Sequence, residues 1–170
     1  MLKSYPIGKS TVELPCSVVA ISAKSGAQQG AMTASAMYVS QVPALILVSI
    51  AKSLATYELI EKSKAFAINI LSENQIALAK KLASVHGKGV DKLKELKVAT
   101  SAASTVKAPL IDGCFGYIEC KVKGSFSDVE GDHAIYIGEA VSFKLDKSLK
   151  PLVWLENKYF KVGSECKLKV

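Results

Sequence analysis

The residues best suited to chemistry form one short cluster, Ser49–Thr56, in which an apolar segment gives way to hydroxyl groups and one cation. Lys52 supplies the charge, and Ser53 and Thr56 stand where a helix is expected to begin. A helix N-terminus presents N–H groups without intrahelical acceptors at the positive end of its dipole, so it suits a phosphate. The same spacing also fits a helix that Ser53 merely caps while Lys52 is solvated. The cluster alone leaves both interpretations open.

A second cluster, Gly30–Ala36, is uncharged and rich in small residues and hydroxyl groups. Small residues let a backbone approach a flat ligand closely, and amide and hydroxyl groups can pair with its polar edge. An ordinary strand edge built from Ala and Ser has the same composition. Taken alone, this cluster favours the strand edge over a ligand-binding wall.

Other familiar catalytic arrangements are missing from the sequence. It has no G-x-S-x-G elbow, no P-loop and no G-x-G-x-x-G motif. Ser, Cys, Asp and two histidines, His86 and His133, would allow a hydrolase triad, but no motif supports one. The four cysteines lack C-x-x-C spacing, which argues against a zinc site and against a disulfide scaffold. We therefore expect reduced thiols, no metal site and no covalent hydrolysis.

Length and composition predict one globular domain over residues 1–170. Of the 170 residues, 49% are hydrophobic and 22% charged, which suits one buried core. The net charge of +7 is carried entirely by Lys, and a chain without Arg is a poor candidate for binding nucleic acid. Small anionic partners remain favoured.

The sequence also predicts a cytoplasmic location without membrane contact. The segment between Lys24 and Lys52 is uncharged, but its polar residues leave no run of 18 apolar residues. The N-terminus lacks the apolar core of a signal peptide.

The elements expected to position the two clusters are mostly strands. Apolar or alternating patterns predict strands at 17–23, 44–50, 65–71, 115–126 and 133–145, with a bulge at Gly138. Helices are expected at 54–61, from a capping box at 72–75 to about Gly87, and at 90–96. The ranges 24–30 and 99–105 are expected to be loops. Because strands and helices do not alternate strictly, the pattern predicts a mainly β barrel with a few helices.

Alternation within 115–126 predicts which side chains of that strand are buried. Ile118, Cys120 and Val122 share one face, and Glu119, Lys121 and Lys123 share the other. We expect the second face to be solvated.

Six short segments of the chain form a pattern through their order along the sequence. They are Ser17–Ser22 after Pro15, Gly30–Ser35, Val42–Ser53 with Thr56, Phe66–Leu71, Ile118–Cys120, and Gly131–His133 followed by Ile137–Glu139. Each piece alone is unspecific. In this order and spacing, over roughly residues 11 to 163, they resemble the flavin reductase-like family with the FMN-binding split barrel. Trp154 departs from the family pattern, in which Tyr is more common at that place.

The resemblance implies a six-stranded Greek-key split barrel that forms homodimers and binds FMN at the dimer interface. By position, the ring of the flavin would be lined by Met32, Thr33, Ala34 and Ser35. The ribityl-phosphate arm would be held by Ser49, Ile50, Ala51, Lys52, Ser53 and Thr56. His133 would lie on the nicotinamide side of the flavin as the catalytic residue.

The implied activity is reduction of FMN or FAD by NAD(P)H, with reduced flavin passed to a partner oxygenase or a ferric acceptor. Such an oxidoreductase needs no nucleophile, which agrees with the missing triad. Two other functions stay open. One is a flavoredoxin-like carrier that keeps its FMN and exchanges electrons with proteins, and the other is a non-catalytic flavin-binding or cationic interaction module.

Overall fold

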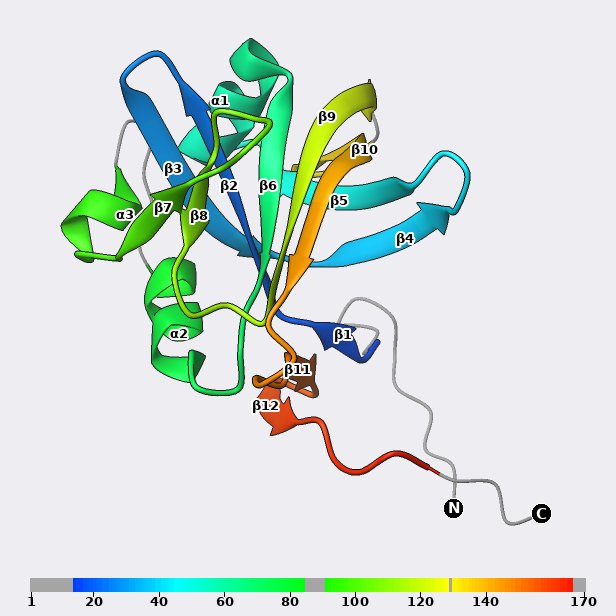
Figure 1. Ribbon diagram of the computed structural model, residues 1–170. Helices are drawn as coiled ribbons and strands as arrows, with labels where there is room; N and C mark the ends of the chain where they lie inside the picture. The colour runs from blue at the N-terminus through cyan, green and yellow to red at the C-terminus, as the bar shows by residue number, and fades with distance from the viewer. Residues whose placement is uncertain (1–13, 85–90, 129, 167–170) are drawn as a thin grey trace.

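The computed structural model describes residues 14–84, 91–128 and 130–166, and its main feature is a curled antiparallel sheet (Figure 1). The order of its seven strands is β3-β2-β6-β9-β10-β5-β4. Their bounds are β2 Val19–Ser25, β3 Gln28–Ala34, β4 Ala36–Ser40, β5 Leu45–Ala51, β6 Ala65–Ile70, β9 Gly116–Phe126 and β10 His133–Leu145. Each of the five strands expected from the sequence is present, with ends shifted by at most about two residues.

The sheet closes on itself through one bent segment. β3 and β4 lie at opposite edges of the strand order, yet only Ser35 separates them along the chain. One nearly continuous stretch therefore joins both edges, which turns the open sheet into a barrel. Counted as a single bent strand, β3 and β4 leave six strands, so the predicted split-barrel fold class is confirmed.

Two smaller sheets flank the barrel. β1 (Cys16–Ser17), β11 (Leu152–Leu155) and β12 (Lys158–Lys161) form the first, in the order β1-β11-β12. β7 (Thr100–Ala102) and β8 (Pro109–Ile111) form the second. The expected loop at 99–105 was wrong for the three residues of β7, because backbone pairing with β8 stabilises an exposed polar strand that has no apolar pattern.

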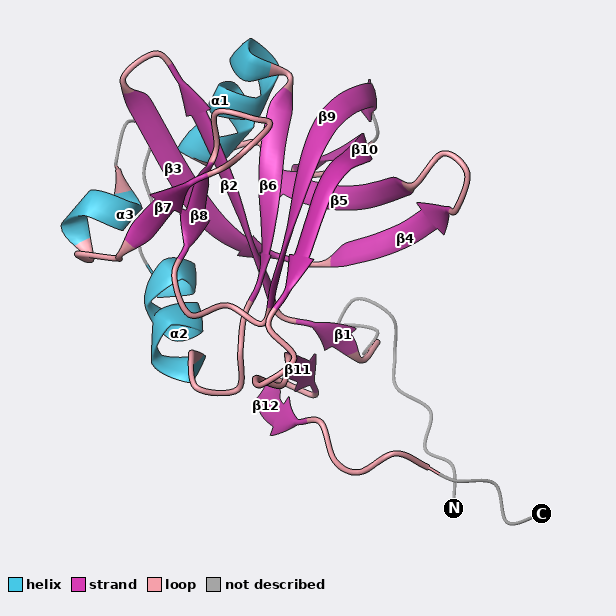
Figure 2. Ribbon diagram, in the orientation of Figure 1, coloured by secondary structure: helices cyan, strands magenta, loops and turns pink. Residues whose placement is uncertain are grey.

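The helices are short and lie outside the barrel (Figure 2). They are α1 (Ala55–Ser63), α2 (Ile76–Ser84) and α3 (Lys92–Glu95). No helix in the described ranges is long and apolar enough to cross a membrane. The N–H of Ser72 donates to the side-chain oxygen of Gln75 at 2.9 Å, which is one half of the predicted capping box. The N–H of Gln75 donates to the Ser72 carbonyl instead of its hydroxyl, and α2 begins after Gln75. Gly87 and Val90, where two helix boundaries were expected, lie outside the described residues.

The loop expected at residues 24–30 is much shorter in the structure. Only Gly26 and Ala27 separate β2 from β3, and Gly26 adopts a φ of 60°. A two-residue turn with positive φ matches the twist of the flanking strands, and glycine adopts it without strain. The polar residues on either side therefore pair as strands.

The hydrophobic core has a part inside the barrel and a part beneath it. The inner part includes Ile21, Ile50, Phe66 and Tyr136, all with 0% exposure. At Gly138 the β9–β10 register shifts, as predicted, and an added Cβ would lie 2.5 Å from the Phe66 ring. The outer part packs α2, α3 and β11 against the sheet.

Glu119 contradicts the expectation that its face of β9 is solvated, because its side chain is 1% exposed. Its carboxylate accepts hydrogen bonds from the Ser104 N–H at 3.0 Å, the Ser104 hydroxyl at 2.7 Å, the Thr105 N–H at 2.6 Å and the Val106 N–H at 3.0 Å. Burial raises the pKa of Glu119, but these hydrogen bonds outweigh burial and lower the pKa to about 2. The buried carboxylate thus fastens the loop between β7 and β8 to the barrel.

Candidate functional site

A hollow of about 360 Å³, here called the ring pocket, opens where β1, β3, β5, β10, β11 and β12 meet. This volume lies in the range of small-molecule sites. Six of the residues that the resemblance nominated line it, namely Met32, Thr33, Ala34, Ser35, Ser49 and His133. The remaining lining residues are Cys16, Ser17, Val18, Ala83, Trp154 and Tyr159.

Strand pairing brings these distant residues together. β5 runs antiparallel to β10, with Ala51 opposite His133 and Ser49 opposite Ile135. The end of one strand therefore lies beside the start of the other. The bend between β3 and β4 adds Met32 to Ser35 to the same place.

His133 is held at the rim by the turn before β10. The Lys52 N–H donates to the Asp132 carbonyl at 2.9 Å, and the Lys52 ammonium donates to the Gly131 carbonyl at 3.1 Å. Gly131 has a φ of 134°, which strongly favours glycine. The imidazole Nδ1 lies 2.7 Å from the Asp132 carboxylate, and this hydrogen bond lowers the pKa of Asp132. With Nδ1 engaged, Nε2 is the ring nitrogen that can face a ligand.

The start of α1 differs from the expected arrangement. The N-cap is Leu54, which makes no side-chain capping bond, so the alternative in which Ser53 caps the helix is wrong. Ser53 is exposed one residue earlier, directly after Lys52. Ser53 and Lys52 thus directly precede the N-cap of a nine-residue helix, and the Lys52 ammonium lies on the Gly131 carbonyl.

The structure places Ile50 and Thr56 in packed positions. Ile50 is 0% exposed because alternate residues of β5 point into the barrel, whereas Ser49 and Ala51 point out. Thr56 is 2% exposed, and its hydroxyl oxygen lies 3.6 Å from the position of a Cβ at Gly30. Their side chains therefore serve packing, and at Ile50 only the backbone remains for a ligand.

Sequence reasoning missed the six remaining lining residues of the ring pocket, and three of them form one wall. Cys16 on β1 pairs with Trp154 on β11, and its sulfur lies 3.5 Å from the Ser35 hydroxyl. The Trp154 and Tyr159 rings pack edge to face with centroids 4.9 Å apart. Burial raises the pKa of Tyr159. Of the residues in this wall, only Trp154 was noted from the sequence, because it departs from the family pattern.

Comparisons with known proteins show the family to which the chain belongs. The family model of the flavin reductase like domain matches residues 11–163. The chain is 28% identical over 158 residues to the NADH-dependent FMN reductase AsuE2 of Streptomyces nodosus subsp. asukaensis, a match covering 90% of this chain and 82% of that protein. The solved structure of flavin reductase PheA2 in its native state matches with a TM-score of 0.74 and 30% identity, covering 89% of this chain and 92% of that one.

A further relative is named as the reductase component of a monooxygenase. The reductase component of the flavin-dependent trigonelline monooxygenase of Acinetobacter baylyi is 37% identical over 106 residues. That match covers 62% of this chain, and the chain spans only 31% of that relative's length.

Proposed function

The chain belongs to the flavin reductase-like domain family, and from this premise we propose that it is an NAD(P)H-dependent flavin reductase that binds FMN in the ring pocket. The observation that carries the proposal is the meeting of β3, β5 and β10 in one hollow, with His133 at its rim. The named activity of AsuE2 supports both FMN as the flavin and NADH as a donor.

The residues present fit FMN in two respects. The described residues of the pocket wall carry no carboxylate or ammonium group, Ala34 offers apolar surface to a flat ring, and Thr33 and Ser35 offer hydroxyl groups to its polar edge. Met32 lines the pocket, but its side chain packs in the barrel core and is 5% exposed. Lys52 supplies a cation for the phosphate beside the start of α1. When bound, FMN accepts a hydride from the nicotinamide donor and passes electrons onward.

The protein's contribution is binding and orientation. Hydroxyl and N–H donors of Thr33 and Ser35 would stabilise negative charge on the polar edge of the ring. The Trp154–Tyr159 pair closes one side of the pocket and limits water there. His133, oriented by Asp132, would position the donor, since hydride transfer depends on a short and aligned approach.

His133→Ala is expected to lower kcat/KM for NADH by about tenfold, since the oriented ring would no longer hold the donor. FMN affinity should stay nearly unchanged, and because the side chain is 45% exposed, so should folding. Steady-state kinetics and FMN titration test both expectations. Asp132→Asn, which weakens the orientation but keeps the ring, should give a smaller loss. Unchanged kinetics in His133→Ala would remove the residue from the mechanism.

We further propose that reduced flavin leaves for a partner monooxygenase. The relative from Acinetobacter baylyi is named as the reductase component of such a pair, which supports this direction of electron flow. A flavin held in an open pocket, with His133 and Ser35 partly or fully exposed, can exchange with solvent.

A homodimer is the second part of the proposal. β4 is an edge strand, and its hairpin with β5 extends away from the barrel (Figure 1). It exposes four large apolar side chains, Met37 by 59%, Tyr38 by 60%, Val39 by 48% and Val42 by 89%. Apolar side chains grouped on an edge strand suit an interface, and a second copy would enlarge the flavin site.

We expect light scattering to give twice the mass of one 18.1 kDa chain. Met37→Lys combined with Val39→Lys should give a monomer that binds FMN weakly, because two buried cations would oppose the interface. Met37→Leu serves as the control and should remain dimeric. A monomeric unaltered chain that binds FMN tightly would refute the shared site.

A further inference from the structure

A second hollow, of about 630 Å³, is lined by five lysines and is named here the lysine groove. Its cations are Lys24, Lys64, Lys107, Lys121 and Lys123. They come from the end of β2, the α1–β6 junction, the loop between β7 and β8, and β9. Hydroxyl groups of Ser25, Ser63 and Thr105 share the lining.

The groove is separate from the ring pocket. The ring pocket includes Val18, just before β2, whereas the groove includes Lys24 and Ser25 at the far end of that strand. A seven-residue strand is roughly 20 Å long, which is the scale of the separation. An adjoining hollow of about 400 Å³ shares Lys24 and Lys107, so the basic surface continues along the β7–β8 hairpin.

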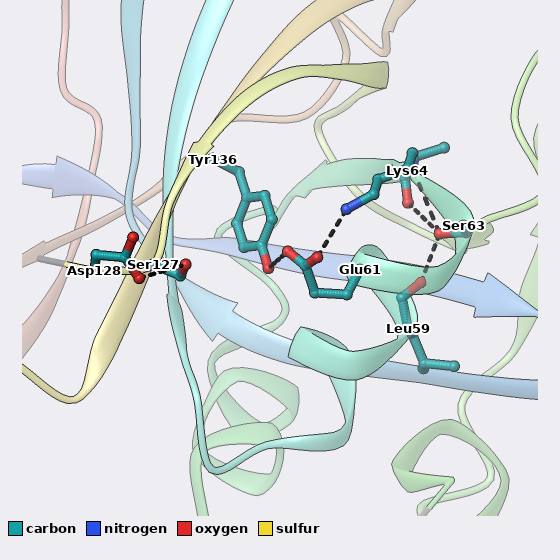
Figure 3. Close-up of polar contacts among 8 residues, drawn as sticks. Leu59, Glu61, Ser63, Lys64, Ser127, Asp128 and Tyr136 are labelled. Atoms are coloured by element: carbon teal, nitrogen blue, oxygen red, sulfur yellow. Dashed lines mark hydrogen bonds and ion pairs between the residues drawn. The ribbon is translucent and has the colours of Figure 1, made fainter.

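Two of the five lysines already have acidic partners. The Lys64 ammonium lies 2.7 Å from the Glu61 carboxylate, which also accepts a hydrogen bond from the Tyr136 hydroxyl at 2.6 Å (Figure 3). These two contacts, from Lys64 first and Tyr136 second, lower the pKa of Glu61. Lys123 pairs with Glu139 at 2.6 Å.

The other three lysines leave the groove strongly positive. Over residues 14–84, 91–128 and 130–166, no carboxylate forms an ion pair with Lys24, Lys107 or Lys121. Glu119 lies beneath the wall and keeps its negative charge, because its donors in residues 104–106 are neutral, but the three lysines outnumber this one carboxylate. Like charges gathered in a concave surface focus a positive potential and attract an anion.

The walls that carry these lysines are held in place before any ligand arrives. Glu119 fastens the chain up to Val106, and Lys107 follows directly. Lys121 pairs with Ala65 in the β6–β9 ladder, and the Val122 N–H donates to the Lys64 carbonyl at 2.9 Å. A preorganised site loses less entropy on binding.

We infer that the lysine groove binds a small anion that carries two or more phosphate groups. Its volume suits a small molecule rather than a flat protein surface, and three unpaired cations match several separated negative charges. Among the described residues no aromatic side chain lines it, so phosphate groups rather than a nucleobase would carry recognition. This binding activity lies beyond flavin reduction and does not depend on it.

The test is calorimetric titration of the 170-residue chain with inorganic triphosphate at physiological ionic strength. Lys107→Gln combined with Lys121→Gln should weaken binding by at least about tenfold, because two charge-assisted contacts are lost. Lys144→Gln combined with Lys147→Gln removes the same charge from exposed positions on and after β10 and should leave the affinity within about twofold.

An assay of flavin reduction distinguishes a failure of this inference from a failure of the proposed function. The groove variant should reduce FMN at the unaltered rate, since none of its changes touches the ring pocket. Absence of triphosphate binding, an equal loss in both double variants, or competition between triphosphate and FMN would each overturn the inference. The first outcome would show that the groove holds no phosphate site. The second would show that binding depends only on the net charge of the protein, and the third that triphosphate binds where FMN binds.

Discussion

Lys52→Gln combined with Ser53→Ala is expected to weaken FMN binding about a hundredfold, while riboflavin binding falls by no more than about twofold. Both residues lie just before the N-cap of α1, where helix N–H groups would add to the attraction for a dianion. A hydrogen bond to a charged group contributes about 1.5–3 kcal/mol, and each 1.4 kcal/mol is about tenfold in affinity. Riboflavin lacks the phosphate and therefore reports all other effects of the variant.

Two controls sharpen this comparison. Lys62→Gln removes one charge near the other end of the same helix and should leave both flavins unaffected. Thr56→Ala changes a residue that is 2% exposed, so it should lower thermal stability without altering the ratio of FMN to riboflavin affinity. Titration of flavin fluorescence gives all of these affinities. Equal losses for the two flavins would contradict the phosphate assignment.

Glu119→Gln is expected to lower the free energy of unfolding by about 3 kcal/mol near neutral pH. The folded carboxyl has a pKa of about 2, against an ordinary value of 4.5. A depressed pKa means that the ionised form is stabilised by folding. An amide has only one oxygen to accept the donors of Ser104, Thr105 and Val106, and it turns an NH₂ group toward the rest.

The same pKa shift predicts a pH dependence with a definite sign. The stabilisation from Glu119 is complete above about pH 4.5 and is lost as the pH falls toward about 2. The difference between the unaltered chain and Glu119→Gln should therefore shrink across this window. Urea unfolding at several pH values measures it, with Glu165→Gln, an exposed carboxylate, as control. A difference that stays constant from pH 6 to pH 3 would contradict the account.

Patterned segments explain why most of the fold could be predicted. β10 begins at His133 and ends at Leu145 as expected from its period-two pattern. The buried positions are Ala134, Tyr136 and Gly138, which alternate with the apolar residues that predicted the strand. Alternation identifies faces of a strand but does not reveal a loop that covers a face. For that reason Glu119 was expected in solvent, although residues 104–106 bury it.

The site was predictable only in part for a related reason. The resemblance nominated Ser49 and His133, and antiparallel pairing brings them to one hollow. It also nominated Ile50, whose side chain the pleat of β5 turns into the core. Cys16 and Trp154 were missed because their pairing joins distant parts of the chain through strands too short to show a period.

The most direct test of the flavin reductase account is an anaerobic titration of the purified protein and FMN with NADH and, separately, NADPH. The account predicts that at least one nucleotide bleaches the visible absorption of FMN far faster with the protein than without it, and that air restores the colour. Bound FMN that neither nucleotide bleaches above the protein-free rate would contradict a reductase and favour an electron carrier. No binding of FMN at all would contradict the ring pocket itself.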